Sequence, residues 1–184
     1  MALAHQLVSN LPMLVRAATI SDAAAIARIH VDTWRAAYRG HGPDSVLANL
    51  SVERREAFWR ERLTQEKGAV FVAEEKGSVI GFCDLIPSRD ADADAQVVEI
   101  AAIYIEPASW RKGAGGALCK QAFAEAQNRG CKSITLWVLT TNTAARHFYE
   151  RIGFVPDGSS KTDKWPDGSA LSEVRYRISI QQTK

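Results

Sequence analysis

The chain has few cysteines, and their spacing does not suit a disulfide framework or a zinc site. Cys83, Cys119 and Cys131 are the three cysteines among 184 residues, and no two of them form a C-x-x-C pair. They lie in or beside apolar segments, which is typical of buried thiols in a reducing compartment. The sequence therefore predicts no structural disulfide and no metal, and it favours a cytoplasmic protein.

The chain also has no long hydrophobic run and no strongly basic stretch. No apolar segment approaches the roughly 20 residues that cross a bilayer, and residues 1–17 do not read as a secretory signal. The formal net charge is only +2. We therefore expect neither a membrane nor a nucleic acid as a partner.

The acidic residues between two apolar segments form a second feature that excludes a metal. Asp90, Asp92 and Asp94 resemble the start of a calcium loop, but Ala95 and Ala101 stand where its glycine and its twelfth-position glutamate belong. This run is predicted to be a solvated loop.

The composition is that of a soluble globular protein, with 46% hydrophobic and 24% charged residues. We expect one domain over residues 13–180, preceded by an extension at 1–12. The patterns predict an α/β fold with a mixed central sheet flanked by helices. The expected strands are 13–16, 69–74, 78–86, 96–105, 133–139, 154–155 and 173–180, and the expected helices are 22–38, 51–65, 118–129 and 143–152.

A loop rich in glycine and positive charge separates an apolar run from a helix-like stretch. The run is Val97–Ile105, and Trp110–Leu118 reads W-R-K-G-A-G-G-A-L. Glycine lets the backbone adopt positive φ and approach a ligand closely, and the start of a helix presents free amides to an anion. The loop therefore predicts a site for a phosphate-bearing small molecule.

Two familiar glycine loops do not fit this segment. A Walker loop requires Lys followed by Ser or Thr, and neither pair follows Gly116. A dinucleotide loop requires G-x-G-x-x-G, and Leu118 stands where its third glycine belongs. The motifs therefore exclude a nucleotide-binding α/β protein of either kind.

The segment is similar to the pyrophosphate loop of the GNAT superfamily of N-acetyltransferases, (Q/R)-x-x-G-x-(G/A). Gly113 and Gly115 occupy its two small positions, and Trp110 replaces the usual Gln or Arg. Asn142–Phe154, N-T-A-A-R-H-F-Y-E-R-I-G-F, resembles the late signature N-x-x-(A/S)-x-x-x-Y-x-x-x-G-F, and residues 15–22 resemble the usual opening I-R-x-A-x-x-x-D. The likeness, which spans most of the chain, implies a bacterial-type member.

The resemblance implies acetyl-coenzyme A as co-substrate. The backbone of Ile103 and Ile105 would pair with pantetheine and polarise the thioester carbonyl, and Asn142 would touch the cofactor while also capping a helix. The residues expected to hold the pyrophosphate are Arg111, Lys112, Gly113, Ala114, Gly115 and Gly116.

The resemblance also implies the residues that move protons. Tyr149 stands at the motif tyrosine, where a hydroxyl can protonate the leaving thiolate; the alternative is a core tyrosine whose hydroxyl finds a backbone partner. Glu99, in an apolar strand roughly 13 Å before Ile103, is the candidate base, acting through water; the alternative is a partly exposed or ion-paired strand glutamate. Another family position for a glutamate holds Trp137, which excludes that base.

The first two helices line the acceptor pocket in this superfamily. His30, Trp34 and Tyr38 recur at helical spacing, so Trp34 and Tyr38 are candidate acceptor contacts, although such a stripe also suits simple packing. We therefore expect direct acetyl transfer to the primary amine of a small molecule or peptide. The alternative is a non-catalytic acyl-CoA-binding sensor or partner domain. The resemblance also allows a homodimer.

Overall fold

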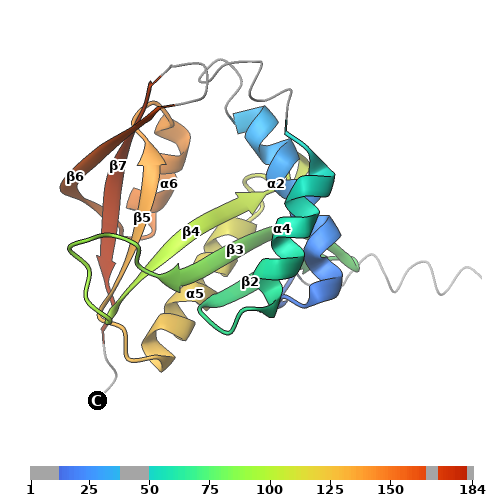
Figure 1. Cartoon of the computed structure of the whole chain (residues 1–184), viewed down its shortest axis with the longest axis horizontal. Helices are drawn as coiled ribbons and strands as arrows, with labels where there is room; N and C mark the ends of the chain where they lie inside the picture. Colours follow the sequence, from blue (N-terminus) through green and yellow to red (C-terminus); the bar gives the residue numbers. More distant parts are fainter. Residues whose placement is uncertain (1–12, 38–49, 165–169, 182–184) are drawn as a thin grey trace, which may run out of the picture.

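The computed structural model describes residues 13–37, 50–164 and 170–181. Within them, helices cover both faces of a seven-stranded sheet (Figure 1). The order of strands and helices is the predicted one, so the α/β fold with a mixed sheet is confirmed. The elements are β1 (Leu14–Ala17), η2 (Ile20–Asp22), α2 (Ala23–Ala37), α4 (Val52–Thr64), β2 (Ala69–Glu75), β3 (Ser78–Pro87), β4 (Val97–Ile105), η3 (Pro107–Ser109), α5 (Ala114–Asn128), β5 (Ser133–Leu139), α6 (Thr143–Arg151), β6 (Val155–Lys164) and β7 (Ala170–Ser179).

The central feature of the sheet is the short pairing of β4 with β5. The strand order is β1-β2-β3-β4-β5-β7-β6, and only β4 and β5 run parallel among the described strands. Their pairing begins at Val97 with Ser133 and ends at Glu99 with Thr135, although both strands continue. Figure 1 shows the two arrows diverging beyond this point. The sheet is therefore open between the carboxyl ends of two parallel strands, where α/β proteins commonly bind ligands.

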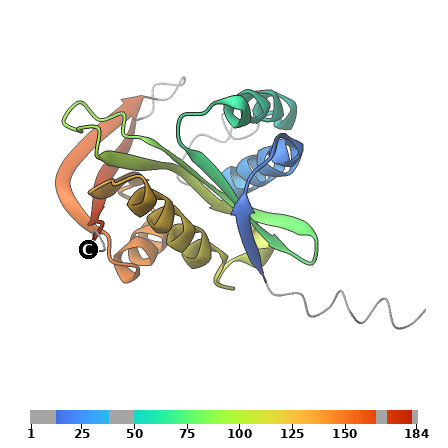
Figure 2. The same cartoon turned by 90° about the horizontal axis from the view of Figure 1, so that it is seen from below.

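Each face of the sheet has its own apolar core. Figure 2 shows α2 and α4 on one side and α5 and α6 on the other. On the α5–α6 side, Leu118, Leu136 and Phe154 are almost completely buried. On the α2–α4 side, Trp59 and Phe82 are buried against apolar residues of α2. A residue's place on one face therefore decides which helices it meets.

A β-bulge lies where β4 leaves β5. On β3, Asp84 pairs with Ala102 and Leu85 pairs with Ile100, so Ala101 is the extra residue of β4. A bulge locally disrupts the ladder and increases the twist. The bulge therefore occurs within two residues of the last β4–β5 pair.

The prediction for the strand at 154–155 was wrong in its length. β6 runs to Lys164, and β7 begins at Ala170. Between Pro156 and Ser160 the pairing with β7 shifts, and Gly158 there adopts a φ of +91°. Glycine and polar residues are typical of turns, so residues 156–160 were not predicted as a strand. In the structure these residues form a bulge in the edge strand β6.

The prediction of a solvated acidic loop was also wrong in part. Residues 88–96 form a loop, but Asp90 and Asp92 both pair with Arg175 of β7, at 3.0 and 2.6 Å. Arg175 is 4% exposed and also binds Asp157 of β6 at 2.7 Å. These ion pairs attach the loop to β7 and, through Arg175, to β6.

No helix among the described residues is long and apolar enough to cross a membrane.

Candidate active site

The glycine loop forms the amino-terminal end of α5. Gly113 is the N-cap residue with a φ of +95°, and its carbonyl accepts the first helical hydrogen bond from Ala117 N at 3.0 Å. No side chain caps this end, and Arg111 also has a positive φ, +62°. Arg111, Lys112 and Gly113 are exposed. The first-turn amides and two cations are thus available to an anion, as a pyrophosphate site requires.

The close approach of α5 to α6 explains a second glycine of the loop. A Cβ on Gly115 would lie 3.1 Å from Cζ of Phe148, which is closer than most real Cβ contacts. A larger residue at 115 would therefore displace the Phe148 ring or the start of α5.

The backbone of Ile103 and Ile105 points away from β3. Glu106 N donates to Ile80 O at 2.9 Å, so the bonded pairs of this antiparallel ladder are Glu106–Ile80 and every second pair after it. Ile103 and Ile105 belong to the other set, and their N–H and C=O groups face the open side toward β5. This is the edge that the sequence predicted for pantetheine.

One of these backbone groups already has partners. The carbonyl oxygen of Ile105 accepts hydrogen bonds from Thr33 Oγ1 at 3.0 Å and from Trp110 Nε1 at 2.6 Å. Trp110, which departs from the family motif, thus ties the glycine loop to the end of β4. The N–H of Ile105 and the backbone of Ile103 are the groups on this edge that a ligand would meet.

Asn142 caps the start of α6 and Tyr149 lies within it, on the same face of the sheet as α5. Asn142 Oδ1 accepts from Ala145 N at 3.1 Å, so its capping role is present in the structure. Tyr149 is 8% exposed, and its ring packs near Phe148, Phe154 and Tyr176. Tyr149 belongs to the core cluster against which Ile103 and Ile105 also pack. The candidate acid and the open edge of β4 therefore share one face.

Glu99 is buried and ion-paired. It is 2% exposed, and its carboxylate accepts hydrogen bonds from Arg89 Nε at 3.2 Å and Arg89 N at 3.3 Å. A third bond comes from Nη2 of the same arginine, and the bonds to Glu99 raise the pKa of the Arg89 guanidinium. The buried carboxylate of Glu99 is therefore held by an arginine whose own side chain is largely exposed.

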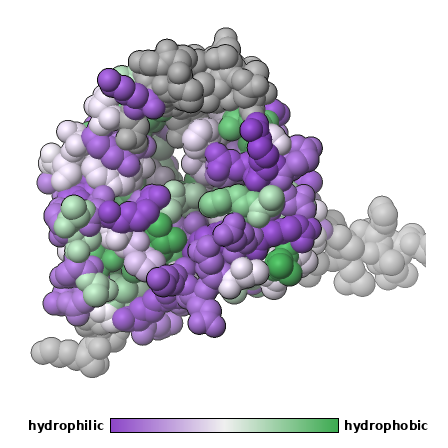
Figure 3. Space-filling model, in the orientation of Figure 1, coloured by the Kyte–Doolittle hydropathy of each residue, from purple (hydrophilic) through white to green (hydrophobic). Residues whose placement is uncertain are grey.

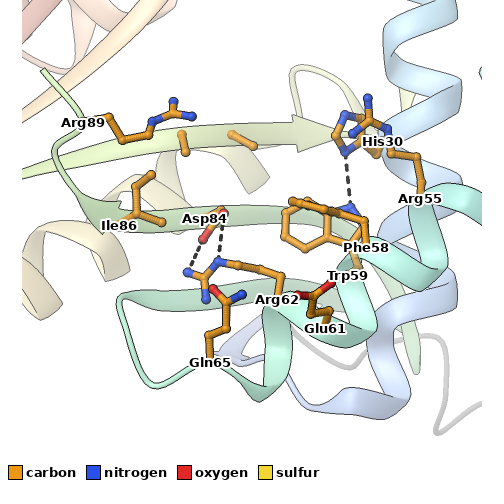
Figure 4. A pocket seen from close by; sticks show the side chains of 12 residues that line it. His30, Arg55, Phe58, Trp59, Glu61, Arg62, Gln65, Asp84, Ile86 and Arg89 are labelled. Carbon is orange, nitrogen blue, oxygen red and sulfur yellow. Dashed lines mark hydrogen bonds and ion pairs between the residues drawn. The ribbon is translucent and has the colours of Figure 1, made fainter.

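A pocket of about 360 Å³ opens between α4 and the sheet. Figure 4 shows Arg89 at one end, His30 and Arg55 at the other, and Asp84 with Arg62 between them. Figure 3 shows a hollow in the mostly hydrophilic face that carries α4. The bulge of β4 forms part of the pocket wall through Ala101 and Ala102, whose side chains are single methyl groups. The pocket is lined by His30, Arg55, Phe58, Trp59, Glu61, Arg62, Gln65, Asp84, Ile86, Arg89, Ala101 and Ala102.

A buried ion pair crosses this pocket. Arg62 Nη2 lies 2.6 Å from Asp84 Oδ1, and Arg62 Nε donates to Oδ2 at 3.3 Å. Burial raises the pKa of Asp84, and the hydrogen bond and charge of Arg62 oppose that rise. This pair was not predicted from the sequence. The available signal was a lone carboxylate, Asp84, inside the apolar strand 78–86.

His30 is a neutral histidine in the wall of the pocket. Its Nδ1 accepts from Trp59 Nε1 at 3.3 Å, so its proton resides on Nε2. Burial, aided by the charge of Arg55, lowers the His30 pKa to about 3. Nε2 is buried and has no hydrogen-bond partner among the described residues. A buried donor without a partner is costly and suggests a missing one.

The acceptor contacts predicted on α2 have different outcomes. Trp34 packs beside His30, with ring centroids 5.6 Å apart, and the Arg55 guanidinium lies 5.7 Å from the Trp34 ring. Trp34 therefore supports two residues of the pocket and is not itself among those that line it. Tyr38 lies outside the described residues. In the described part of the chain, no three acidic, histidine or cysteine side chains are grouped to hold a metal.

The open edge of β4, the glycine turn at the start of α5 and Tyr149 all lie in the part of the chain that one family model covers. The Acetyltransferase (GNAT) family model matches residues 23–154. The chain belongs to the GNAT acetyltransferase family.

Similar proteins agree with this assignment. The chain is 31% identical over 176 residues to the uncharacterized N-acetyltransferase YuaI of Bacillus subtilis, covering 89% of this chain and 98% of YuaI. Two solved structures share the fold. PaiA N-acetyltransferase of Thermoplasma acidophilum, in complex with coenzyme A, has a TM-score of 0.70 at 18% identity, over 89% of this chain and 98% of that one. YncA of Salmonella typhimurium, with acetyl-CoA, has a TM-score of 0.69 at 23% identity, over 93% and 95%. The chain is therefore an enzyme of the acyltransferase class.

Proposed function

We propose that this protein transfers the acetyl group of acetyl-coenzyme A directly to the primary amine of a small molecule or peptide. The observation that carries the proposal is the divergence of β4 from β5 after Glu99 and Thr135, beside the uncapped start of α5. Ala101, the bulge residue that lines the pocket on the α4 face, lies two residues after the last β4–β5 pair and so beside this opening.

The residues at this opening fit a coenzyme A thioester. Gly113 supplies the backbone turn that directs the first amides of α5 outward, with open space where a side chain would be. The N–H of Ile105 and the backbone of Ile103 line the free edge of β4. The thioester, when bound, supplies an activated acetyl group, and a backbone N–H of β4 would stabilise the charge that develops on its carbonyl oxygen.

Proton transfer is assigned to residues on the two faces of the sheet. An alkylammonium acceptor has a pKa of about 10.4, so it must lose a proton before it attacks. Glu99, through water at Arg89, is the proposed acceptor of that proton on the α4 face. Tyr149 on the α6 face is the proposed donor to the leaving thiolate. The pocket beside the β4 bulge is the proposed acceptor site.

A screen of primary amines with acetyl-coenzyme A tests the proposal by release of free thiol, together with calorimetric titration of coenzyme A. Thiol release that depends on a particular amine, and an acetylated product seen by mass spectrometry, is the expected result. Coenzyme A binding without thiol release in any arm would instead support a non-catalytic acyl-CoA-binding domain.

A further inference from the structure

We propose that the acceptor is a small amine that carries its own carboxylate, held by Arg55 and by the Nε2–H of His30, with its amine at the bulge of β4. This inference rests on the proposed function and names the substrate class of that site. It begins with the charges of the pocket, whose lining holds three arginines.

Two of the three arginines are already neutralised. Arg62 pairs with Asp84 at 2.6 Å, and Arg89 binds Glu99. Arg55 is half-buried, and among the described residues it has no carboxylate within ion-pair distance. Its guanidinium carbon lies 5.7 Å from the centroid of the Trp34 ring, a cation–π contact that does not use its N–H groups as hydrogen-bond donors. Counting the described residues alone, the positive charge of Arg55 at this end of the pocket has no counter-charge within ion-pair distance.

The second observation is the unpartnered donor of His30. His30 is only 6% exposed, its Nδ1 is occupied by Trp59, and its Nε2 is a buried atom without a partner among the described residues. Because the ring is neutral, Nε2 can only donate. Arg55 and His30 lie at the same end of the pocket in Figure 4, so both donors serve one oxygen-bearing group.

The anion bound there is not part of coenzyme A. The proposed pyrophosphate site is at α5, which covers one face of the sheet, whereas Arg55 lies on α4 over the other face (Figure 2). The remaining charge of the lining, Glu61, is exposed and stands six residues further along α4, roughly 9 Å along its axis. A carboxylate delivered with the acceptor is therefore the group that matches the Arg55 end.

The distances limit the size of the acceptor. The His30 ring centroid lies 5.0 Å from that of Tyr104, and Ala102 is two residues earlier on the same face of β4. Two residues of strand span about 7 Å. An amine at the bulge and a carboxylate at His30 would therefore belong to one small molecule, such as an α-amino acid or a slightly longer amino acid. A peptide amino terminus lacks this carboxylate.

The test compares matched acceptors: free amino acids, the corresponding amino acid amides and short peptides, each with acetyl-coenzyme A and detection of released thiol. The wild-type protein should turn over at least one free amino acid with a kcat/KM at least tenfold above that of its amide. Arg55→Gln should raise KM for that acid roughly 10- to 100-fold and leave the amide unchanged. Arg60→Gln, at an exposed arginine of the same helix that pairs with Glu56, is the control and should change neither.

The outcomes separate this inference from the proposed function. Turnover of amides or peptides equal to that of the acids, or an unchanged KM in Arg55→Gln, would overturn the carboxylate site while acetyl transfer stands. No thiol release in any arm would overturn the proposed function itself. His30→Phe keeps the ring and removes the donor; if it folds, a rise in KM for the acid alone is expected, and no change would remove His30 from the site.

Discussion

The indole N–H of Trp137 on β5 donates a hydrogen bond to Asp90 Oδ1 at 3.0 Å. Arg175 pairs with the same aspartate, and its guanidinium lies 5.7 Å from the Trp137 ring. Asp90 directly follows Arg89, the partner of Glu99. Trp137 occupies one of the two positions at which family members can carry a basic glutamate, and Glu99 occupies the other. Trp137 therefore helps to fix the loop that lies beside Glu99.

The first prediction concerns Glu99 as a base. Glu99→Gln should lower kcat/KM mainly near neutral pH, with recovery at high pH, where the acceptor amine is already deprotonated. The pH–rate profile on a confirmed acceptor is the measurement. Because Arg89 is largely exposed, the variant leaves no buried charge without a partner. A profile that does not change would make solvent the base and Glu99 a structural ion-pair residue.

The second prediction concerns Tyr149 as an acid. Tyr149→Phe should retain coenzyme A affinity and lower kcat by roughly 10²–10⁴-fold, because only the phenolic hydroxyl is lost. Stopped-flow or steady-state thiol release measures the effect. Full turnover in the variant would contradict the assignment.

Tyr176→Phe is the matched control for that experiment. The Tyr176 hydroxyl donates to Glu150 Oε1 at 2.7 Å and accepts from Arg146 Nε at 3.1 Å, so its role is structural. Its removal should lower the free energy of unfolding by about 1–3 kcal/mol and leave kcat unchanged at temperatures where the protein is folded.

The third prediction concerns the glycine loop. Gly113→Val should weaken coenzyme A binding strongly, because a β-branched residue is strained at a φ of +95°. Gly115→Val should do the same through its contact with Phe148. Gly158→Val places equal strain in β6, at a φ of +91° and with open space around it. Calorimetry should show coenzyme A affinity reduced in the first two variants only, and unchanged affinity in both would refute the assignment.

The fourth prediction concerns acid stability and His30. Folding lowers the His30 pKa from 6.5 to about 3, so between these values the unfolded chain binds a proton that the folded chain does not. This contribution to stability is complete above about pH 6.5 and is lost as the pH falls toward 3. Between pH 7 and 5 it amounts to about 2 kcal/mol.

Denaturant unfolding of His30→Gln at the two pH values measures this term. The amide oxygen of Gln can still accept from Trp59, and the acid-induced loss of stability should be smaller than in the wild-type protein by that amount. His147→Gln, at an exposed histidine, should retain the wild-type dependence. Equal slopes in all three proteins would show that His30 is protonated without cost.

The parts of the molecule that depend on local patterns were predictable. The run Val97–Ile105 is apolar on both sides because it lies in the middle of the sheet. The glycines before Leu118 lead into the expected helix, although it begins at Ala114, four residues earlier than predicted, and includes Gly115 and Gly116. β6 could not be predicted, because its sequence V-P-D-G-S-S-K-T-D-K has the composition of a loop and becomes a strand only through its pairing with β7.

The acceptor pocket also depends on contacts that no local pattern encodes. Arg62 and Asp84 meet across 22 residues, and His30 and Trp59 across 29. Stripe spacing on α2 identified His30 and Trp34 as neighbours, but it could not show that His30 lacks a partner at Nε2. Which charges of the pocket are paired can be determined only from the structure, where α4 faces β3 and β4.

The burial of all three thiols has a practical consequence for assays. Cys83, Cys119 and Cys131 are each at most 4% exposed, and burial raises the pKa of each thiol, that of Cys119 to about 12. Thiolate, the form that attacks a disulfide dye, is therefore scarce in the folded protein. A dye that counts released coenzyme A should have almost no background from the enzyme, and a slow extra signal of up to three equivalents would report unfolding during the assay.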